Sequence, residues 1–178
     1  MAAADKVVVR AATREDMRTI HRLIHELATY EGAPDGPKLS AQDLVEDGFE
    51  SNPAWFFALV AELDGEVVGY AMLNRAYSSW TRRALYLEDL YVTPAHRRHG
   101  VGMLLLREIC KIAVREDIHR IDWHVLEDNP PANAFYARLG ARDMRRSEGR
   151  AALRLDRPHI ERVAAAVDQP ASTAPINT

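Results

Sequence analysis

The clearest structural signal in this chain is the run Tyr86-Leu87-Glu88-Asp89-Leu90-Tyr91-Val92-Thr93-Pro94-Ala95-His96-Arg97-Arg98-His99-Gly100-Val101-Gly102, which leads directly into the apolar stretch from Met103 to Val114. The run predicts a strand that ends at Pro94, then a basic turn with two glycines, then a helix. The first backbone N–H groups of a helix have no partner within the helix, so they can hold an anion. The sequence therefore predicts a pyrophosphate site at this turn.

The glycines and arginines of the turn suit phosphate oxygens. Gly100 and Gly102 let the main chain approach a ligand closely and take φ angles that a Cβ disfavours, while Arg97 and Arg98 add positive charge. The run lacks the Gly-Lys-Ser/Thr of a P-loop and the third glycine of a dinucleotide fingerprint, so those two phosphate-binding folds are disfavoured. A basic turn that only caps a helix is the alternative that this short pattern leaves open.

Length and composition favour one domain. A chain of 178 residues with 47% hydrophobic content can bury a full core but is too short for two ordinary domains. We expect a single domain over residues 1–167 and a disordered tail over 168–178, where Pro, Ala, Ser, Thr and Asn leave little to bury. The net charge of −3 gives no field that would favour nucleic acid as a partner.

Targeting and metal signals are both weak. The N-terminus has no apolar signal core, and no apolar stretch approaches membrane-spanning length, so we expect a cytoplasmic protein that does not act at a membrane. Cys110, the only cysteine, lies in an apolar helical pattern and is expected to be buried and inert. His21 and His25 lie four residues apart, but no third ligand appears in a suitable context, so we expect no metal.

Two capping boxes mark helices in the first half of the chain. Thr13 with Asp16 precedes apolar residues at helical spacing, and Ser40 with Asp43 begins a shorter helix that ends near Gly48. Asp64-Gly65 is a strong hairpin signal between two β-like runs. We expect strands over residues 7–9, 56–63, 66–73, 84–92, 119–126 and 152–155, and later helices over 101–115 and 131–140.

This order of elements predicts an α/β fold. The first strands pair as an antiparallel hairpin, and the helix after the glycine turn connects two parallel strands. A mixed sheet, antiparallel in its N-terminal half and parallel in its C-terminal half, with helices on both faces, satisfies both patterns.

Several motifs together resemble one family. From about Val8 to Asp156, the chain resembles the diamine acetyltransferase branch of the GNAT N-acetyltransferases, which includes spermidine/spermine and thialysine acetyltransferases. The resemblance implies the GNAT fold, acetyl-CoA as co-substrate, a primary amine of a small molecule as acceptor, and a homodimer. It is carried by Leu23-Ile24-His25-Glu26-Leu27-Ala28-Thr29-Tyr30-Glu31, Asp43-Leu44-Val45-Glu46-Asp47-Gly48-Phe49, Tyr86-Leu87-Glu88-Asp89 with its turn, and Asn133-Ala134-Phe135-Tyr136-Ala137-Arg138-Leu139-Gly140-Ala141.

The resemblance also implies roles for individual residues. Glu88 matches the family's general base, which works directly or through water, and Tyr136 matches the acid that protonates the departing thiolate. The matching cofactor residues are the pantetheine strand Leu90, Tyr91 and Val92, the pyrophosphate loop Arg97, Arg98, His99, Gly100, Val101 and Gly102, and the asparagine Asn129.

The chemistry requires both kinds of group. An alkyl amine has a pKa near 10, so at neutral pH only about one molecule in a thousand is a free nucleophile, a deficit of roughly 4 kcal/mol. A carboxylate such as Glu88 can take that proton, and a phenol such as Tyr136 can protonate the thiolate, so direct attack needs no enzyme nucleophile. By strand alternation Asp89 is expected on the opposite face from Glu88, as a solvated or structural carboxylate.

The identity of the acceptor amine is the part of the function that the sequence determines least. Polyamine-specific members have an acidic residue at the position of Ser78, whereas the thialysine branch has a hydroxyl residue there, two before Trp80. Arg150 stands where the family usually has tryptophan; it can bind a carboxylate, point to solvent or pair with Glu148. Tyr30, Glu31 and Glu148 match further positions around the acceptor amine, and Trp80 is also a candidate for binding it. We therefore expect an amino-acid-like amine before a polyamine.

Two other functions stay open at this point. A protein or peptide acetyltransferase would need an open groove, whereas the segment from Glu31 to Pro37 suggests a covered site. A non-catalytic acetyl-CoA sensor would need only the turn and the pantetheine strand, so the presence of both Glu88 and Tyr136 favours an enzyme.

Overall fold

The computed structural model describes residues 6–165 of the chain. It comprises two compact units, the first extending to Asp128 and the second beginning at Asn129. The expected tail over residues 168–178 lies outside the described residues, and a single domain over 1–167 stays a prediction.

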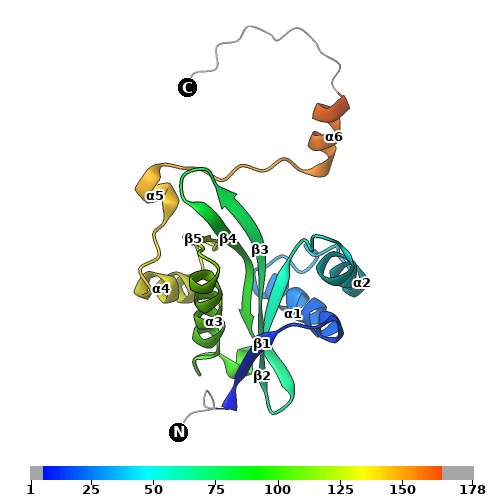
Figure 1. Ribbon diagram of the computed structural model, residues 1–178, viewed down its shortest axis with the longest axis vertical. Coiled ribbons are helices and arrows are strands. Elements are labelled where there is room, and N and C mark those ends of the chain that lie inside the picture. The colour runs from blue at the N-terminus through cyan, green and yellow to red at the C-terminus, as the bar shows by residue number, and fades with distance from the viewer. Residues whose placement is uncertain (1–5, 166–178) are drawn as a thin grey trace, which may run out of the picture. The chain divides into compact units, whose positions relative to one another are not determined.

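The first unit is built on a five-stranded mixed sheet (Figure 1). The strands lie side by side in chain order, and every neighbouring pair is antiparallel except the parallel pair β4–β5. The expected mixed sheet is therefore confirmed. The strands are β1 (Val8–Ala11), β2 (Phe57–Leu63), β3 (Glu66–Ser78), β4 (Arg82–Val92) and β5 (Arg120–Asp122).

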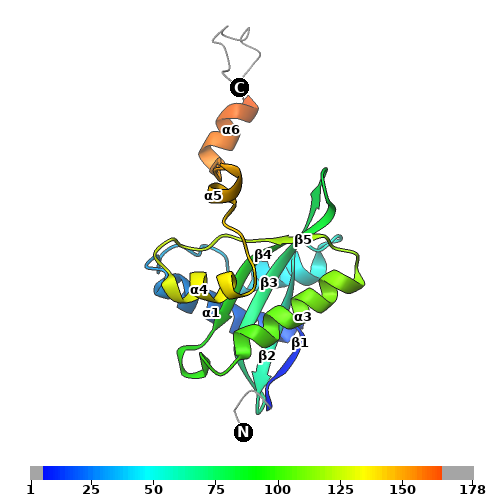
Figure 2. The same ribbon diagram turned by 90° about the vertical axis from the view of Figure 1, so that its left-hand side faces the viewer.

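Helices cover both faces of this sheet (Figures 1 and 2). One face carries α1 (Met17–Tyr30) and α2 (Ala41–Val45), and the other carries α3 (Val101–Arg115). Short 3₁₀ turns η2 (Arg14–Asp16) and η4 (Pro94–His96) precede α1 and α3, and a π-helical turn η3 (Glu46–Glu50) follows α2.

Both predicted capping boxes are present. The backbone N–H of Thr13 donates to Oδ2 of Asp16 at 2.7 Å, and the N–H of Ser40 donates to Oδ2 of Asp43 at 2.6 Å. Asp16 also accepts hydrogen bonds from Arg10 on β1, at 2.7 and 3.0 Å. Because the guanidinium favours the charged carboxylate, it lowers the pKa of Asp16 and fixes the start of α1 against the sheet.

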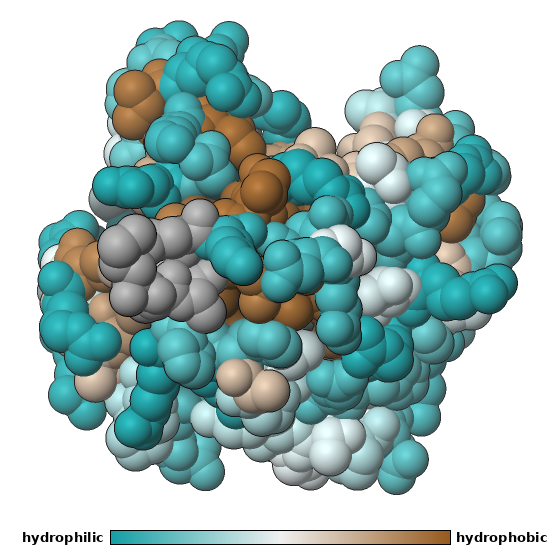
Figure 3. Space-filling model, turned by 90° about the horizontal axis from the view of Figure 1, so that it is seen from below, coloured by the Kyte–Doolittle hydropathy of each residue, from teal (hydrophilic) through white to brown (hydrophobic). Residues whose placement is uncertain are grey.

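The core lies on both sides of the sheet. Against α1 and α2, alternate strand residues such as Val60, Tyr70 and Met72 pack on the apolar face of α1. On the opposite face the intervening strand residues Leu73, Leu85 and Leu87 are buried under α3, which contributes the fully buried Leu105 and Ile109. The end of the sheet that carries the β2–β3 hairpin shows mainly hydrophilic side chains (Figure 3).

The Asp64-Gly65 hairpin is confirmed. Both residues have positive φ, 50° and 84°, as a tight two-residue turn between twisted strands requires. The next hairpin is longer than predicted, because β3 continues to Ser78 and β4 begins at Arg82. At its base Gly69 pairs with Val92, and a Cβ on Gly69 would lie 2.7 Å from the carbonyl oxygen of Tyr91.

A β-bulge interrupts β4 at Glu88. Met72 on β3 pairs with Asp89, while the next residue, Leu73, pairs with Leu87, so Glu88 is an extra residue without a partner position. Such a bulge bends the strand and breaks the alternation of its side chains. The site described below depends on this irregularity.

The second unit contains only helices among its described residues. These are α4 (Pro130–Arg138), α5 (Met144–Glu148) and α6 (Arg157–Ala165). The predicted helix near Pro131 is confirmed, and Gly140 follows it with φ 83°. The predicted strand over 152–155 is wrong, since no described strand pairs with it and Leu153 is 94% exposed.

Two further expectations need correction. The strand predicted over 119–126 is reduced to Arg120–Asp122, because only these residues pair with β4. Cys110 is exposed rather than buried, since it follows the buried Ile109 and turns to the outer face of α3. None of the helices within residues 6–165 is both long and apolar enough to cross a membrane.

Candidate active site

The turn before α3 has the backbone of an anion cradle. Gly100 is the N-cap residue and has φ 84°, and Arg98 also has positive φ, 63°. The first hydrogen bond of the helix runs from the N–H of Leu104 to the carbonyl of Gly100 at 3.0 Å. No described side chain caps this helix, so the N–H groups of the first turn face the space before it.

Gly102 is better explained by the approach of a ligand than by the packing or backbone conformation of the chain. A Cβ at this position would meet only Cγ2 of Val92, at 3.9 Å, which is ordinary contact. Gly102 is also helical, where glycine is less favourable than alanine. Packing therefore gives no reason for glycine here, whereas an approaching phosphate does.

Arg97 makes several contacts within the protein. Its Nε donates to the carbonyl of Val92 at 2.8 Å, and its guanidinium lies over the rings of Tyr30 and Tyr91, at 4.4 and 5.3 Å from their centroids. Arg97 thereby joins the end of α1 to the end of β4. Arg98 and His99 are exposed at the turn, where they add the basic side chains.

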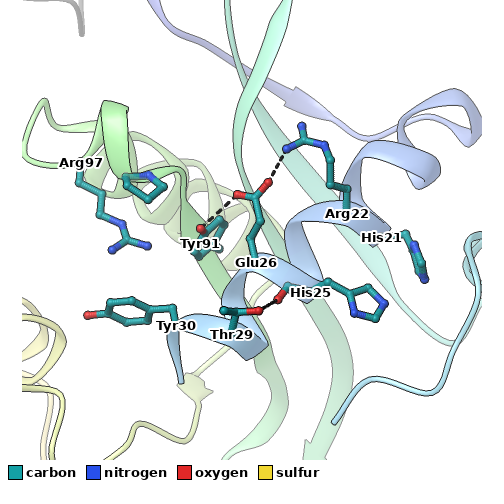
Figure 4. A pocket seen from close by; sticks show the side chains of 9 residues that line it. His21, Arg22, His25, Glu26, Thr29, Tyr30, Tyr91 and Arg97 are labelled. Atoms are coloured by element: carbon teal, nitrogen blue, oxygen red, sulfur yellow. Dashed lines mark hydrogen bonds and ion pairs between the residues drawn. The ribbon is translucent and has the colours of Figure 1, made fainter. Parts of the chain in front are cut away.

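An open pocket of about 710 Å³ lies between α1 and the end of β4 (Figure 4). Within it, Glu26 pairs with Arg22 and accepts a hydrogen bond from the hydroxyl of Tyr91 at 3.2 Å. His21 contacts the carbonyl of Leu39 at 3.0 Å. Across residues 6–165, no three His, Cys, Asp or Glu side chains gather to hold a metal ion.

The bulge places Glu88 and Asp89 on the same face of the sheet. Asp89 pairs with Met72, which faces α1, and Nδ2 of Asn74, two residues further on that face, donates to Oε2 of Glu88 at 3.5 Å. The expectation that Asp89 points opposite to Glu88 is therefore wrong, because the extra residue shifts the alternation.

Asp89 is a largely buried carboxylate with a dedicated partner. The hydroxyl of the fully buried Tyr70 donates to its Oδ2 at 2.8 Å. The pKa of Asp89 is raised to about 6, chiefly by burial and also by the nearby charges of Glu88 and Glu31, while the Tyr70 hydrogen bond acts in the opposite direction and lowers it. Glu31 ends α1, so carboxylates from α1 and β4 share this region.

Ser78 and Trp80 occupy the tip of the β3–β4 hairpin. The buried Ser78 Oγ accepts the N–H groups of Trp80 and Thr81, both at 3.2 Å, so this hydroxyl closes the turn. Trp80 is 79% exposed. A role of either residue in binding the acceptor amine stays a prediction.

The second unit carries the predicted acid. Tyr136 lies on α4 beside Phe135, with ring centroids 5.2 Å apart, and burial raises the pKa of Tyr136 to about 12. Asn129, predicted on the cofactor side, caps α4 by accepting the N–H of Ala132 at 3.3 Å.

Arg150 lies in the same unit, where it forms an ion pair with a neighbouring carboxylate. Its Nε is 3.1 Å from Oε2 of Glu148, so of the three alternatives for this side chain the structure shows the pairing.

Comparison with known proteins gives the family. Residues 17–141 match the model of the Acetyltransferase (GNAT) family. The chain belongs to this family. It is 39% identical over 151 residues to a thialysine N-epsilon-acetyltransferase of Sus scrofa, covering 80% of this chain and 88% of that protein. It is 36% identical over 163 residues to the human spermidine/spermine N(1)-acetyltransferase-like protein 1, covering 88% of this chain but 23% of that protein.

Solved structures agree on the fold of this GNAT chain. An integron cassette protein from the mobile metagenome of V. cholerae superposes with a TM-score of 0.73 at 23% identity, covering 90% of this chain and 99% of the other. The predicted family, GNAT fold and N-acetyltransferase class are thus confirmed. Acetyl-CoA is the co-substrate that the family uses.

Two features of the site escaped sequence reasoning. The bulge at Glu88 has no signal in the local sequence, since Leu87, Glu88 and Asp89 read as an ordinary strand. The contact of Tyr70 with Asp89 had a weak signal, because a tyrosine within a buried strand needs a partner for its hydroxyl.

Proposed function

We propose that this GNAT protein transfers the acetyl group of acetyl-CoA to a primary amine of a small, amino-acid-like molecule such as thialysine or lysine, by direct attack. The observation that carries the proposal is the pair of neighbouring carboxylates on bulged β4, which leads through one turn to the uncapped first turn of α3. The likeness to thialysine acetyltransferases over most of their length supports this class of acceptor.

Backbone groups of the protein would bind the pyrophosphate of the co-substrate. The first-turn N–H groups of α3 suit the pyrophosphate, and the missing Cβ of Gly102 lets it approach them. Leu90, Tyr91 and Val92 supply the neighbouring strand backbone, as the family resemblance implies. Acetyl-CoA, when bound, supplies the activated acetyl group.

The proton steps fall to two side chains. Glu88 accepts the ammonium proton, directly or through water, so that the free amine can attack. Tyr136 then donates its phenolic proton to the departing sulfur. Because burial raises the pKa of Tyr136 to about 12, this phenol is fully protonated at neutral pH and can serve as the acid.

The test is to change each proton carrier without changing its shape. Tyr136→Phe and Glu88→Gln should each lower kcat about 10²-fold or more, while the Kd of acetyl-CoA changes less than about threefold. Steady-state rates and calorimetric titration with acetyl-CoA measure the two quantities. Full turnover in Tyr136→Phe would reject the acid assignment, and acetyl-CoA binding without amine turnover in the wild type would favour a sensor.

The family resemblance is the ground for the proposed assembly, and the composition of the sequence is the ground for the proposed location and partners. We infer a homodimer in the cytoplasm, with no nucleic-acid or membrane partner. Light scattering coupled to size-exclusion chromatography would give the mass of the particle, for which a 20.0 kDa chain predicts about twice that value.

A further inference from the structure

Tyr70 is a buried tyrosine whose hydroxyl contacts a carboxylate. Tyr70 lies on β3 with its side chain fully buried, and its hydroxyl must therefore find a partner within the protein. A backbone carbonyl would satisfy it. The partner is instead the carboxylate of Asp89, 2.8 Å away on the neighbouring strand.

Only one oxygen of this carboxylate is fixed. Tyr70 donates to Oδ2, whereas Oδ1 accepts no hydrogen bond from any residue in the range 6–165. Every buried side-chain nitrogen or oxygen in that range has a partner, so the unpaired Oδ1 must reach solvent. Asp89 is therefore anchored at one oxygen and open at the other.

The surroundings of Asp89 favour a cation at the open oxygen. The charged groups that act on it are the carboxylates of Glu88 on β4 and Glu31 at the end of α1, and both oppose its ionisation. Its remaining neighbour of note, Tyr70 on β3, contributes a neutral hydroxyl. No arginine or lysine within residues 6–165 is among these influences, so a positive ligand would relieve the repulsion.

We propose that Tyr70 is a positioning residue for the acceptor, acting through Asp89: its hydrogen bond holds the carboxylate beside Glu88, with Oδ1 turned to the ammonium group of the amine. The inference rests on the proposed function and deepens it. Glu88 receives the proton of the reacting amine, and Asp89 binds that ammonium group and brings it to Glu88 before the proton leaves.

The arrangement also sets a pH dependence. The pKa of Asp89 is about 6, so the carboxylate is ionised at neutral pH and becomes protonated in mild acid. Protonation removes the charge that binds the ammonium group. Because the Tyr70 hydroxyl stabilises the ionised form, its removal raises the pKa of Asp89 further and moves this loss toward neutral pH.

The first variant is Tyr70→Phe, with Tyr77→Phe as the matched control, because Tyr77 lies on the same strand and is 75% exposed. Between pH 5.5 and 8.5, we expect the KM for thialysine to rise about tenfold in Tyr70→Phe, with the KM for acetyl-CoA unchanged. The acid rise of the thialysine KM should begin at higher pH than in the wild type. Tyr77→Phe should match the wild type in all three respects.

Asp89→Asn is the second variant and serves even if Tyr70→Phe does not fold. Asparagine can still accept the Tyr70 hydrogen bond through its amide oxygen, but it carries no charge. We expect its thialysine KM to be high at every pH and to lose the acid rise.

The outcomes separate the inference from the function on which it rests. An active wild type, with both variants within twofold of its thialysine KM and with the same pH profile, would overturn the inference alone. A wild type that binds acetyl-CoA but acetylates no amine would overturn both.

Discussion

At the scale of single residues, the carboxylates of the site lower the stability of the folded chain. Asp89 lies largely buried next to Glu88, and Glu31 adds a further carboxylate. Such a group lowers the stability of the folded chain wherever it is ionised, and this is the arrangement in which functional carboxylates are commonly found.

Asp89→Asn should therefore stabilise the protein at neutral pH. The pKa of the Asp89 carboxyl group is 3.8 in the unfolded chain and about 6 in the folded one. This difference corresponds to a loss of roughly 3 kcal/mol in the free energy of unfolding when the group is ionised. Well below pH 3.8 the residue is protonated in both states and adds no cost. As the pH rises through 3.8 the unfolded chain releases its proton first, so the folded state loses stability, and the full cost is present once the pH is above 6.

Urea unfolding of the wild type and Asp89→Asn at pH 4.5 and 7.5 measures this cost. We expect the variant to be more stable by about 1–3 kcal/mol at pH 7.5, with most of the difference gone at pH 4.5. Glu66→Gln, at an exposed carboxylate, should show no such change. Equal stabilities of Asp89→Asn and the wild type at pH 7.5 would contradict the claim that the buried charge of Asp89 destabilises the folded chain.

Residue roles were predictable from sequence only where a motif carried them. Glu88 and Tyr136 came from the family resemblance. The face of Asp89 was mispredicted, because alternation assumes a regular strand and the bulge depends on pairing with β3 rather than on local composition.

At the scale of elements, the loop between β4 and α3 is the part whose sequence and structure agree best. The predicted strand, turn and helix are all present, and Gly100 takes the left-handed conformation that its place requires. Gly102 has no such requirement, since it is helical and has space around it.

Gly102→Ala should separate binding from folding. A methyl group at this position meets no atom closer than 3.9 Å, so the free energy of unfolding should stay constant or rise by up to about 1 kcal/mol. In the proposed site the same methyl group would lie where the phosphate approaches the helix, so the Kd of acetyl-CoA should rise about tenfold or more. Calorimetric titration and thermal unfolding test the two effects.

Gly69→Ala is the matched contrast. Its Cβ would lie 2.7 Å from the backbone oxygen of Tyr91, so this variant should lose about 1–3 kcal/mol of stability. If Gly102→Ala bound acetyl-CoA as tightly as the wild type, the anion cradle would have to lie elsewhere.

Elements with local signals were predicted and those that depend on partners were not. The capping boxes and the Asp64-Gly65 turn act within a few residues, and both are confirmed. The strand expected over 152–155 needed an edge to pair with, and α5 and α6 are polar helices of only five and nine residues.

At the scale of the whole molecule, the fold agrees with the family but does not identify the acceptor amine, because one fold can serve many functions. The ranking of an amino-acid-like amine above a polyamine draws on Ser78 and Arg150, and the structure gives each a partner within the protein. Ser78 closes a turn and Arg150 pairs with Glu148, so neither excludes polyamines by itself. The likeness to thialysine acetyltransferases is the stronger support.

The initial rate of thiol release from acetyl-CoA tests the central claim most directly, measured with the purified protein and a panel of thialysine, lysine, ornithine, putrescine, spermidine, an aminoglycoside and a basic peptide. Acetyl transfer to a small amine predicts selective turnover, with a higher kcat/KM for thialysine or lysine than for spermidine. Spermidine turnover at least as efficient would reverse the ranking of acceptors. Acetyl-CoA binding without thiol release for any amine in the panel would contradict the account.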